Sequence, residues 1–186
     1  MSILLLAGSP SVPSRSTRLL QYVGDKLMVH GHSVSTLYVR DLPAQALLHA
    51  DFSNAGLQEA LSRVAQAQAV VVATPVYKAA YSGILKAFLD LLPQDGLKHK
   101  LVLPLATGGS QSHMLALDYA LRPVLSSLSP RHVLSSIYAT DAQLVWSETE
   151  GLVVDPAITV RLVEGLEALT EYLRARHCSR GDVPVL

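Results

Sequence analysis

Five short apolar runs, separated by stretches with helical periodicity, constrain the fold of this chain more than any other feature. They are residues 3–7, 33–39, 69–73, 101–106 and 133–139. The first, third and fourth runs are apolar at nearly every position, which is typical of strands covered on both faces of a parallel sheet. The runs therefore predict a sheet buried between layers of helices.

The intervening stretches repeat apolar residues at helical spacing. They are residues 16–30, 54–68, 82–92, 112–128 and a last stretch from Asp155-Pro156 to Arg176. Aspartate followed by proline favours the start of a helix, because the carboxylate caps the first turn and proline needs no acceptor there. Strand and helix alternate five times, which predicts a doubly wound α/β fold.

The alternation predicts a single domain over residues 1–176, followed by a loose C-terminal tail at residues 177–186. Residues 141–154 fit neither pattern. We expect them to form a surface excursion with a turn at Glu150-Gly151. Trp146, within it, either covers a neighbouring subunit or has no role.

Charge argues against several classes of partner. The chain has 186 residues, with 15 lysines and arginines against 15 aspartates and glutamates. This balance predicts no segregated basic face, and hence no nucleic acid and no membrane surface as partner. Charged residues make up 16% of the chain, below the roughly 25% usual for soluble proteins. A surface so short of charge favours a homo-oligomer.

Targeting and metal-binding signals are also missing. The opening run at residues 3–7 is too short for a signal peptide and lacks the basic segment that precedes one. No apolar stretch reaches the roughly 18 residues of a membrane helix, so we expect a cytoplasmic protein. Cys178 is the single cysteine, and the scattered histidines show no ligand spacing, so no metal site is expected.

The segments that follow the first, third and fourth runs are the candidate site, since ligands bind beyond the carboxyl ends of parallel strands. After the first run come Gly8-Ser9 and Ser14-Arg15-Ser16, with no acidic residue before Asp25. Hydroxyls, an arginine and a helix N-terminus suit a phosphate dianion. The glycine patterns of dinucleotide and ATP loops are absent. A turn that only caps the helix is the alternative.

Two further loops are expected at the same rim, the edge of the sheet where the carboxyl ends of the strands lie. Thr74-Pro75-Val76-Tyr77-Lys78 follows the third run, and its stiff backbone and tyrosine suit a planar heterocycle;. Thr107-Gly108-Gly109 follows the fourth run and lets a ligand approach the backbone closely;. Taken singly, each loop is also explained as a plain strand-to-helix connection. Their coincidence on one rim favours a ligand site.

These segments resemble the NADPH-dependent FMN reductases of the flavodoxin-like superfamily. The resemblance rests on residues 8–16, 74–86 and 107–109, and it extends from residue 3 to about residue 140. It is closest to the reductase of alkanesulfonate-utilising two-component systems, through residues 73–83, 103–109 and 118–125. It implies a flavodoxin-like, doubly wound sheet of five parallel strands in the order 2-1-3-4-5.

The resemblance also implies where FMN binds. The residues that would hold its phosphate are Ser9, Ser14, Arg15 and Ser16. Those that would border the flavin are Pro75, Val76, Tyr77 and Lys78, and those near the isoalloxazine ring are Thr107, Gly108 and Gly109. Many family members have Glu-Tyr-Asn in place of Val76-Tyr77-Lys78, so backbone contacts are expected there rather than side-chain contacts. His113 stands at the mouth of the third loop, where it either touches flavin or nicotinamide or merely begins the helix.

The implied activity is hydride transfer from NADPH to FMN, with no catalytic side chain. Reduced FMN would pass to a partner FMN-dependent monooxygenase, in alkanesulfonate sulfur assimilation. NADH remains possible, because no basic cluster is assignable to a 2′-phosphate. The alternatives are a reductase of quinones or azo dyes that retains FMN, and a non-enzymatic flavodoxin-like electron carrier. The zero net charge argues against the carrier;.

The stretch 112–128 has more apolar surface than one sheet face needs, which favours a dimer or tetramer contact;. Pro123 cannot donate to the carbonyl of Tyr119, so we expect a distorted helix there. In the resembling reductases a tyrosine at this place makes a π-helical turn at the interface of a homotetramer. Tyr119 is expected to favour flavin turnover over retention. Asp118 and Arg122 are expected to form a helix-surface pair.

Overall fold

The computed structural model describes residues 2–181, with side-chain surroundings for residues 2–175. Its strands are β1 (Ser2–Ala7), β2 (Ser33–Tyr38), β3 (Ala69–Tyr77), β4 (Ala80–Tyr81), β5 (Leu101–Gly108), β6 (His132–Val133), β7 (Ile137–Thr140), β8 (Leu144–Ser147) and β9 (Gly151–Val154). Its α-helices are α1 (Arg15–Val29), α2 (Ala44–Leu48), α3 (Ala55–Gln66), α4 (Gly83–Leu89), α5 (Arg122–Ser127) and α6 (Pro156–Gly181). Its 3₁₀ turns are η1 (Val39–Asp41), η2 (Gln111–His113) and η4 (Asp141–Gln143), and η3 (Leu117–Leu121) is a π-helix.

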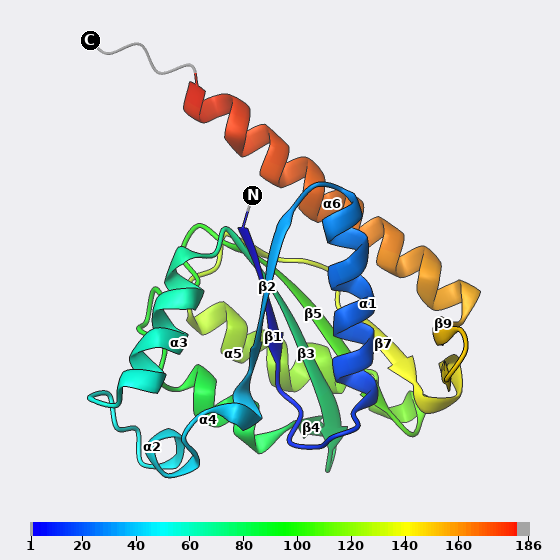
Figure 1. Ribbon diagram of the computed structural model, residues 1–186, viewed down its shortest axis with the longest axis horizontal. Helices are drawn as coiled ribbons and strands as arrows, with labels where there is room; N and C mark the ends of the chain where they lie inside the picture. The colour runs from blue at the N-terminus through cyan, green and yellow to red at the C-terminus, as the bar shows by residue number, and fades with distance from the viewer. Residues whose placement is uncertain (1, 182–186) are drawn as a thin grey trace.

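The main sheet is parallel, in the order β2-β1-β3-β5-β6, with β7 continuing beside β5 beyond β6 (Figure 1). This confirms the doubly wound, flavodoxin-like α/β fold in the order 2-1-3-4-5, with β5 in fourth place and β6 and β7 sharing the fifth. Within this sheet, β4 runs antiparallel to β3, as its hairpin partner.

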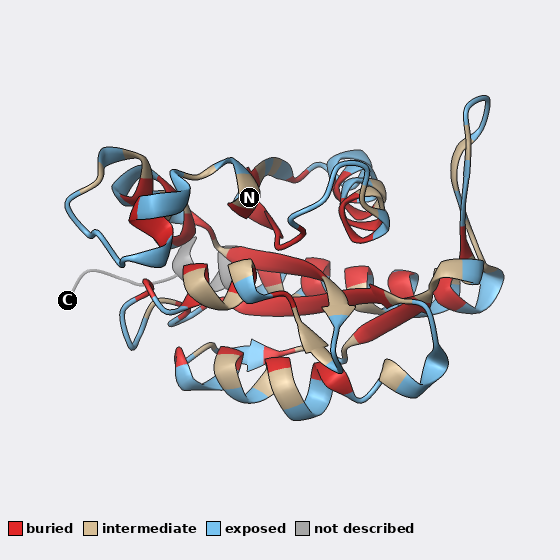
Figure 2. Cartoon of the chain, turned by 90° about the horizontal axis from the view of Figure 1, so that it is seen from below, coloured by how far each residue is buried: buried red, intermediate tan, exposed pale blue. Residues whose placement is uncertain are grey.

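Helices cover both faces of this sheet, which lies as a buried layer between them (Figure 2). Ile3 and Leu5 of β1 pack in the same core cluster as α1 and α6. Leu4 and Leu6 point the other way and pack with α3, α4 and α5. Side chains of a strand alternate between faces, so a run that is apolar throughout supplies both cores at once.

The fifth strand, expected to be continuous over residues 133–139, is split between Val133 and Ile137. The guanidinium of Arg122 donates to the carbonyl oxygens of Val133 and Leu134, each at 3.0 Å. It also pairs with Asp118 at 3.1 Å. The expected pair of Asp118 and Arg122 is therefore present, and Arg122 makes contacts that the sequence did not indicate. Its planar fork binds two backbone carbonyls across the break between β6 and β7.

The helix expected over residues 112–128 is not continuous. It begins as the 3₁₀ turn η2, winds as a π-helix through Leu117–Leu121, and becomes the α-helix α5 only at Arg122. The amide of Arg122 donates to the carbonyl of Leu117, five residues back. The expected distortion beside Pro123 and the π-helical turn at Tyr119 are therefore both present.

The excursion at residues 141–154 contains η4 and an antiparallel ribbon of β8 and β9, which stands out from the body beside α1 (Figure 2). Gly151 follows the turn with φ 73°, a conformation that glycine adopts at little cost;. Trp146 is not without a partner, because its ring stacks on the guanidinium of Arg18 within the same chain.

Helix α6 begins at Pro156 as expected and continues to Gly181, past the expected end at Arg176. The last five residues of the expected tail, 182–186, lie outside the described residues. Among the helices that the structure describes, none is both long enough and apolar enough to cross a bilayer.

Candidate functional site

The loop between β1 and α1 gathers hydroxyl groups at a helix N-terminus. Ser14 is the N-cap of α1, and its Oγ accepts from the amide of Thr17 at 3.3 Å. The Oγ of Ser16 lies 3.0 Å from the Oγ of Ser14. Ser9 is buried, and its Oγ accepts from the amide of Ser11 at 3.2 Å. The predicted residues Ser9, Ser14 and Ser16 thus lie on one short segment, where the helix dipole favours an anion.

Thr17 belongs to this cluster, although the sequence argument missed it. Its side chain is 6% exposed. Within the described part of the chain, its Oγ1 is the buried side-chain polar atom that has no hydrogen-bond partner. Leaving a buried hydroxyl unpaired costs about 1–3 kcal/mol, so such a group in a native fold points to a missing partner. The available signal was a third hydroxyl in the run Ser14-Arg15-Ser16-Thr17.

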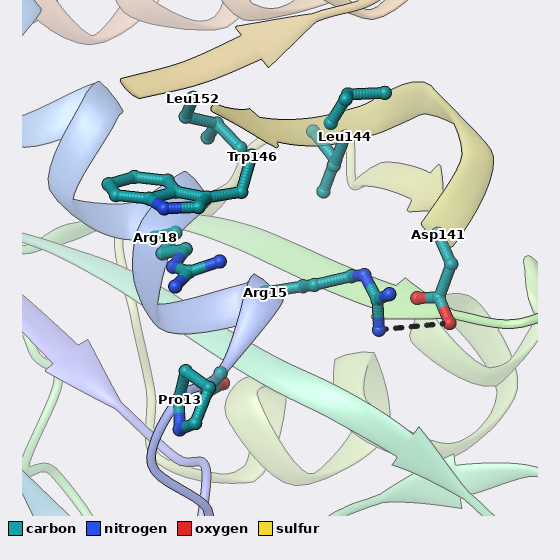
Figure 3. Close-up of a pocket in the computed structure, with 9 residues that line it drawn as sticks. Pro13, Arg15, Arg18, Asp141, Leu144, Trp146 and Leu152 are labelled. Atoms are coloured by element: carbon teal, nitrogen blue, oxygen red, sulfur yellow. Dashed lines mark ion pairs between the residues drawn. The ribbon is translucent and has the colours of Figure 1, made fainter. Parts of the chain in front are cut away.

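Arg15, by contrast, pairs with a carboxylate. Its guanidinium lies 3.3 Å from Asp141, which follows β7, and both side chains are about half exposed (Figure 3). An exposed ion pair of this kind contributes little to stability. Arg15 therefore remains available to a more strongly charged partner.

The second loop is a tight hairpin rather than an open connection. Strand β3 does not end at residue 73 but continues through Pro75, Val76 and Tyr77, and a two-residue turn leads into β4. Both turn residues have left-handed backbones, with φ 48° at Lys78 and φ 62° at Ala79. Hairpin turns of this kind normally use asparagine and glycine, so Lys78 and Ala79 hold a conformation that non-glycine residues seldom adopt.

Hydrogen bonds join the first loop to the second. Ser82, the N-cap of α4, donates from its Oγ to the carbonyl of Gly8. Its amide donates to the Oγ1 of buried Thr74 at 3.0 Å. The amide of Gly8 in turn donates to the carbonyl of Ala73 at 2.8 Å. These buried bonds fix the two loops relative to each other.

A hydrogen bond from Tyr138 of β7 holds the third loop. The buried phenol of Tyr138 donates to the carbonyl of Ser110 at 2.6 Å. Burial, and after it the charge of Asp141, raises the pKa of Tyr138, which keeps the phenol a donor. A Cβ on Gly108 would lie 2.6 Å from the Tyr138 hydroxyl, whereas a Cβ on Gly109 would meet nothing within 4 Å. Gly108 is thus required by packing, and Gly109 faces open space.

The remaining predicted residues border this rim. Thr107 is buried in β5, in register with Pro75 of β3, so the second and third loops leave adjacent strands side by side. His113 ends the 3₁₀ turn η2 and is half-buried. Tyr119, in the π-helix, is 80% exposed. The π-helix contacts β4, so Tyr119 belongs to an element beside the second loop.

The structure therefore brings the three predicted loops together at the carboxyl ends of β1, β3 and β5. They offer buried hydroxyls at one end and an open backbone surface at the other, and an elongated ligand with a phosphate at one end would match both. In the described part of the chain, no three His, Cys, Asp or Glu side chains come together as a metal would require.

The family model for NADPH-dependent FMN reductase matches residues 1–144. An FMN reductase (NADPH) of Pseudomonas putida is 47% identical over 95% of this chain and 90% of its own length. An FMN reductase (NADPH) of Escherichia coli is 43% identical over 98% of this chain and 95% of its own length. The apo crystal structure of an NADH:FMN oxidoreductase, EMOB, is 41% identical, with a TM-score of 0.84 over 92% of this chain and 89% of that one. The chain therefore belongs to the family of NADPH-dependent FMN reductases.

Proposed function

We propose that this chain binds FMN across the three loops as a substrate, reduces it with NADPH, and supplies the reduced flavin to a partner FMN-dependent monooxygenase. The observation that carries the binding site is the hydroxyl cluster at the start of α1. Ser14 and Ser16 lie beside the helix N-terminus, and Thr17 keeps a buried hydroxyl without a partner. A phosphate there would supply the acceptor that Thr17 lacks.

The flavin ring fits the other two loops. The backbone of Pro75, Val76, Tyr77 and Lys78 would border one edge of the ring, and the open Gly109 would let the other edge approach the amides of the third loop. FMN, when bound, supplies the chemistry of accepting a hydride from the nicotinamide. The loops position the ring, and no side chain has to gain or lose a proton.

Release of reduced flavin rests on the π-helix. Tyr119 is exposed and belongs to the π-helix, the element that contacts β4. We propose that it favours turnover over retention, and that the face formed by η3 and α5 meets a second copy of the chain in a dimer or tetramer. The proposed role in alkanesulfonate sulfur assimilation is supported by the resemblance in residues 73–83, 103–109 and 118–125.

The decisive experiment mixes the purified protein anaerobically with NADPH and an excess of free FMN, and follows the loss of flavin colour. We expect many equivalents of FMN to be reduced for each protein chain. Reduction of one equivalent that stays bound would instead assign a reductase that retains FMN for quinones or azo dyes. Flavin binding without bleaching would leave an electron carrier.

Thr17→Val tests the phosphate site separately. Valine has nearly the same shape but no hydroxyl, so the free protein should be at least as stable as the parent, because an unpaired buried hydroxyl is removed. The dissociation constant of FMN should rise about 10-fold, by loss of one hydrogen bond to a charged group. Calorimetric titration with FMN and with riboflavin measures this, since riboflavin has no phosphate. An equal loss for both ligands would show that Thr17 does not contact the phosphate.

A further inference from the structure

A cavity of about 410 Å³ lies on the outer side of α1, between its first turn and the ribbon of β8 and β9 (Figure 3). Its volume is in the range of small-molecule pockets. Ser14, Arg15 and Arg18 line it from the helix side, and Asp141 and Trp146 line it from the other side. It shares Ser14 with the hydroxyl cluster but does not coincide with it, because Ser16 and Thr17 are buried and do not line it.

Arg18 and Trp146, which both line this cavity, stack on each other. The guanidinium carbon of Arg18 lies 3.9 Å from the centroid of the indole ring (Figure 3). Stacking occupies the flat face of the guanidinium and leaves its N–H groups, which lie in the plane, free to donate. In the part of the chain that the structure describes, no carboxylate lies within ion-pair distance of Arg18. Arg18 is thus a fixed cation with unused donors.

The charge of the cavity favours an anion. Two guanidinium groups line it, from Arg15 and Arg18, against the single carboxylate of Asp141. The carboxylate is paired with Arg15 at 3.3 Å. The local excess is therefore one positive charge, carried by Arg18. A phosphate would pair with the fork of Arg18 through two charge-assisted hydrogen bonds.

The cavity also offers an aromatic surface. Trp146 is 48% exposed, although Arg18 lies against its ring. Leu144 and Leu152 add apolar walls on the ribbon. An aromatic ring and a phosphate-binding cation in one pocket match a phosphorylated purine nucleoside, which combines a flat base with a dianion.

We propose that this cavity binds the adenosine end of NADPH, with Arg18 bound to the 2′-phosphate and Trp146 against the adenine. The proposal rests on the function proposed above, and it assigns the preference for NADPH over NADH to Arg18. The position adjoins the loop proposed for the FMN phosphate, because Ser14 and Arg15 of that loop also line the cavity. Sequence alone did not reveal the cluster, because Trp146 lies far from Arg18 along the chain.

Direct binding gives the first test. Trp146 is the single tryptophan of the chain, so its fluorescence reports on the cavity without interference from other indoles. Adenosine 2′,5′-bisphosphate, added without flavin, should change this fluorescence in a saturable way, and 5′-AMP should bind about 10-fold more weakly or worse. Equal responses to both probes would overturn the assignment of the 2′-phosphate. This readout does not depend on FMN reduction, so the proposal can fail or hold independently of the proposed function.

Steady-state kinetics give the second test. Arg18→Gln should raise the KM for NADPH about 10- to 100-fold and raise the KM for NADH by a much smaller factor, because NADH has no 2′-phosphate to lose its partner. The KM of Arg18→Lys for NADPH should lie between those of the parent and of Arg18→Gln, since lysine keeps the charge but lacks the planar fork. The matched control is Arg131→Gln, which removes an exposed arginine just before β6, at the opposite end of the strands. Its kinetics should match the parent.

Two kinetic outcomes would contradict the proposal. Equal increases in KM for NADPH and NADH would show that Arg18 does not read the 2′-phosphate. A raised KM for FMN with unchanged nucleotide constants would show that the cavity holds the phosphate of the flavin instead. Absence of FMN reduction by the parent with either nucleotide would count against the proposed function, not against the cavity.

Discussion

Adjacent residues of the same type do different work in this site, as Gly108 and Gly109 show. Gly108 is required because the phenol of Tyr138 occupies the space where its Cβ would be. The phenol cannot move away, since it is buried and bonded to the carbonyl of Ser110. Gly109 has open space around it. The two glycines look the same in the sequence. What distinguishes them is the packing of β7, a strand about thirty residues further along the chain;.

Gly108→Ala should therefore destabilise the protein by about 1–3 kcal/mol, the usual cost of overpacking a filled core. Chemical denaturation measures this free energy of unfolding. Gly109→Ala is the matched control and should stay within about 0.5 kcal/mol of the parent. Combining Gly108→Ala with Tyr138→Phe should recover part of the loss, because the nearest remaining ring atom, Cζ, would lie 3.5 Å away. Equal destabilisation by the two alanines would refute this explanation.

Single-residue contacts could be predicted from the sequence only where the two partners lie close together along the chain. A turn that caps the first helix was the alternative for the loop of Ser14, and such a cap is local, because the amide of Thr17 that it binds lies three residues away. Arg122 was predicted only to pair with Asp118, one helical turn away. Its bonds to the carbonyls of Val133 and Leu134 could not be inferred, because they depend on how the fifth strand breaks. Long-range side-chain partners carry no signature in a single sequence.

Among the elements, the hairpin of β3 and β4 holds strain at the candidate site. Its turn places Lys78 and Ala79 in the left-handed region, where a non-glycine residue costs about 1–2 kcal/mol;. The neighbouring bonds among Gly8, Thr74 and Ser82 hold the base of this hairpin. Strained backbone persists where the surroundings fix it, and such positions cluster at ligand sites.

Ala79→Gly should relieve this strain and raise the free energy of unfolding by about 0.5–1 kcal/mol, after allowance for the greater freedom of glycine in the unfolded chain. The turn would also become less rigid, so the KM for FMN should rise a few-fold. Ala50→Gly is the matched control, because Ala50 has φ 52° in a turn outside the site. It should give the same gain in stability with unchanged flavin kinetics. A KM for FMN that rises equally in both variants would rule out a role for the hairpin turn.

The strands and long helices were largely predictable from periodicity, because burial on two faces leaves a continuous apolar run. The extension of β3 over Thr74-Pro75-Val76-Tyr77 was not predictable, since this segment has the composition of a loop. Its strand pairing comes from neighbours, with Thr74 and Pro75 in register with residues of β5. Helix α2 and the turn η1 were also missed. Both are shorter than the window in which helical periodicity can be recognised.

Across the whole molecule, one buried contact joins the start of β2 to the last helix. The Nε2 of His32 lies 3.1 Å from the Oγ1 of Thr170 in α6, and both residues are buried. Burial lowers the pKa of His32, and positive charges, among them His30 and Arg174, lower it further. The folded protein therefore holds His32 in its neutral form more strongly than the unfolded chain does.

Stability should consequently depend on pH through His32. Because its pKa is lower in the folded state, the unfolded chain binds more protons below about pH 6.5, and the free energy of unfolding falls as pH decreases through that value. His32→Gln keeps a polar side chain but cannot be protonated. It should flatten the decline measured by denaturation between about pH 7.5 and pH 5.5. If the free energy of unfolding of His32→Gln still falls with pH as in the parent, the pH dependence arises from other groups.

The ribbon of β8 and β9 pairs with no other strand that the structure describes. A two-stranded ribbon is marginally stable by itself, so this one depends on the stack of Trp146 on Arg18 and on the contact of β9 with α1. Leu144 anchors the base of the ribbon in the core cluster of α1 and α6, so we expect local opening to involve the exposed outer part while the sheet stays folded;. The mouth of the cavity can thus widen at the rate of a loop motion rather than at the rate of global unfolding.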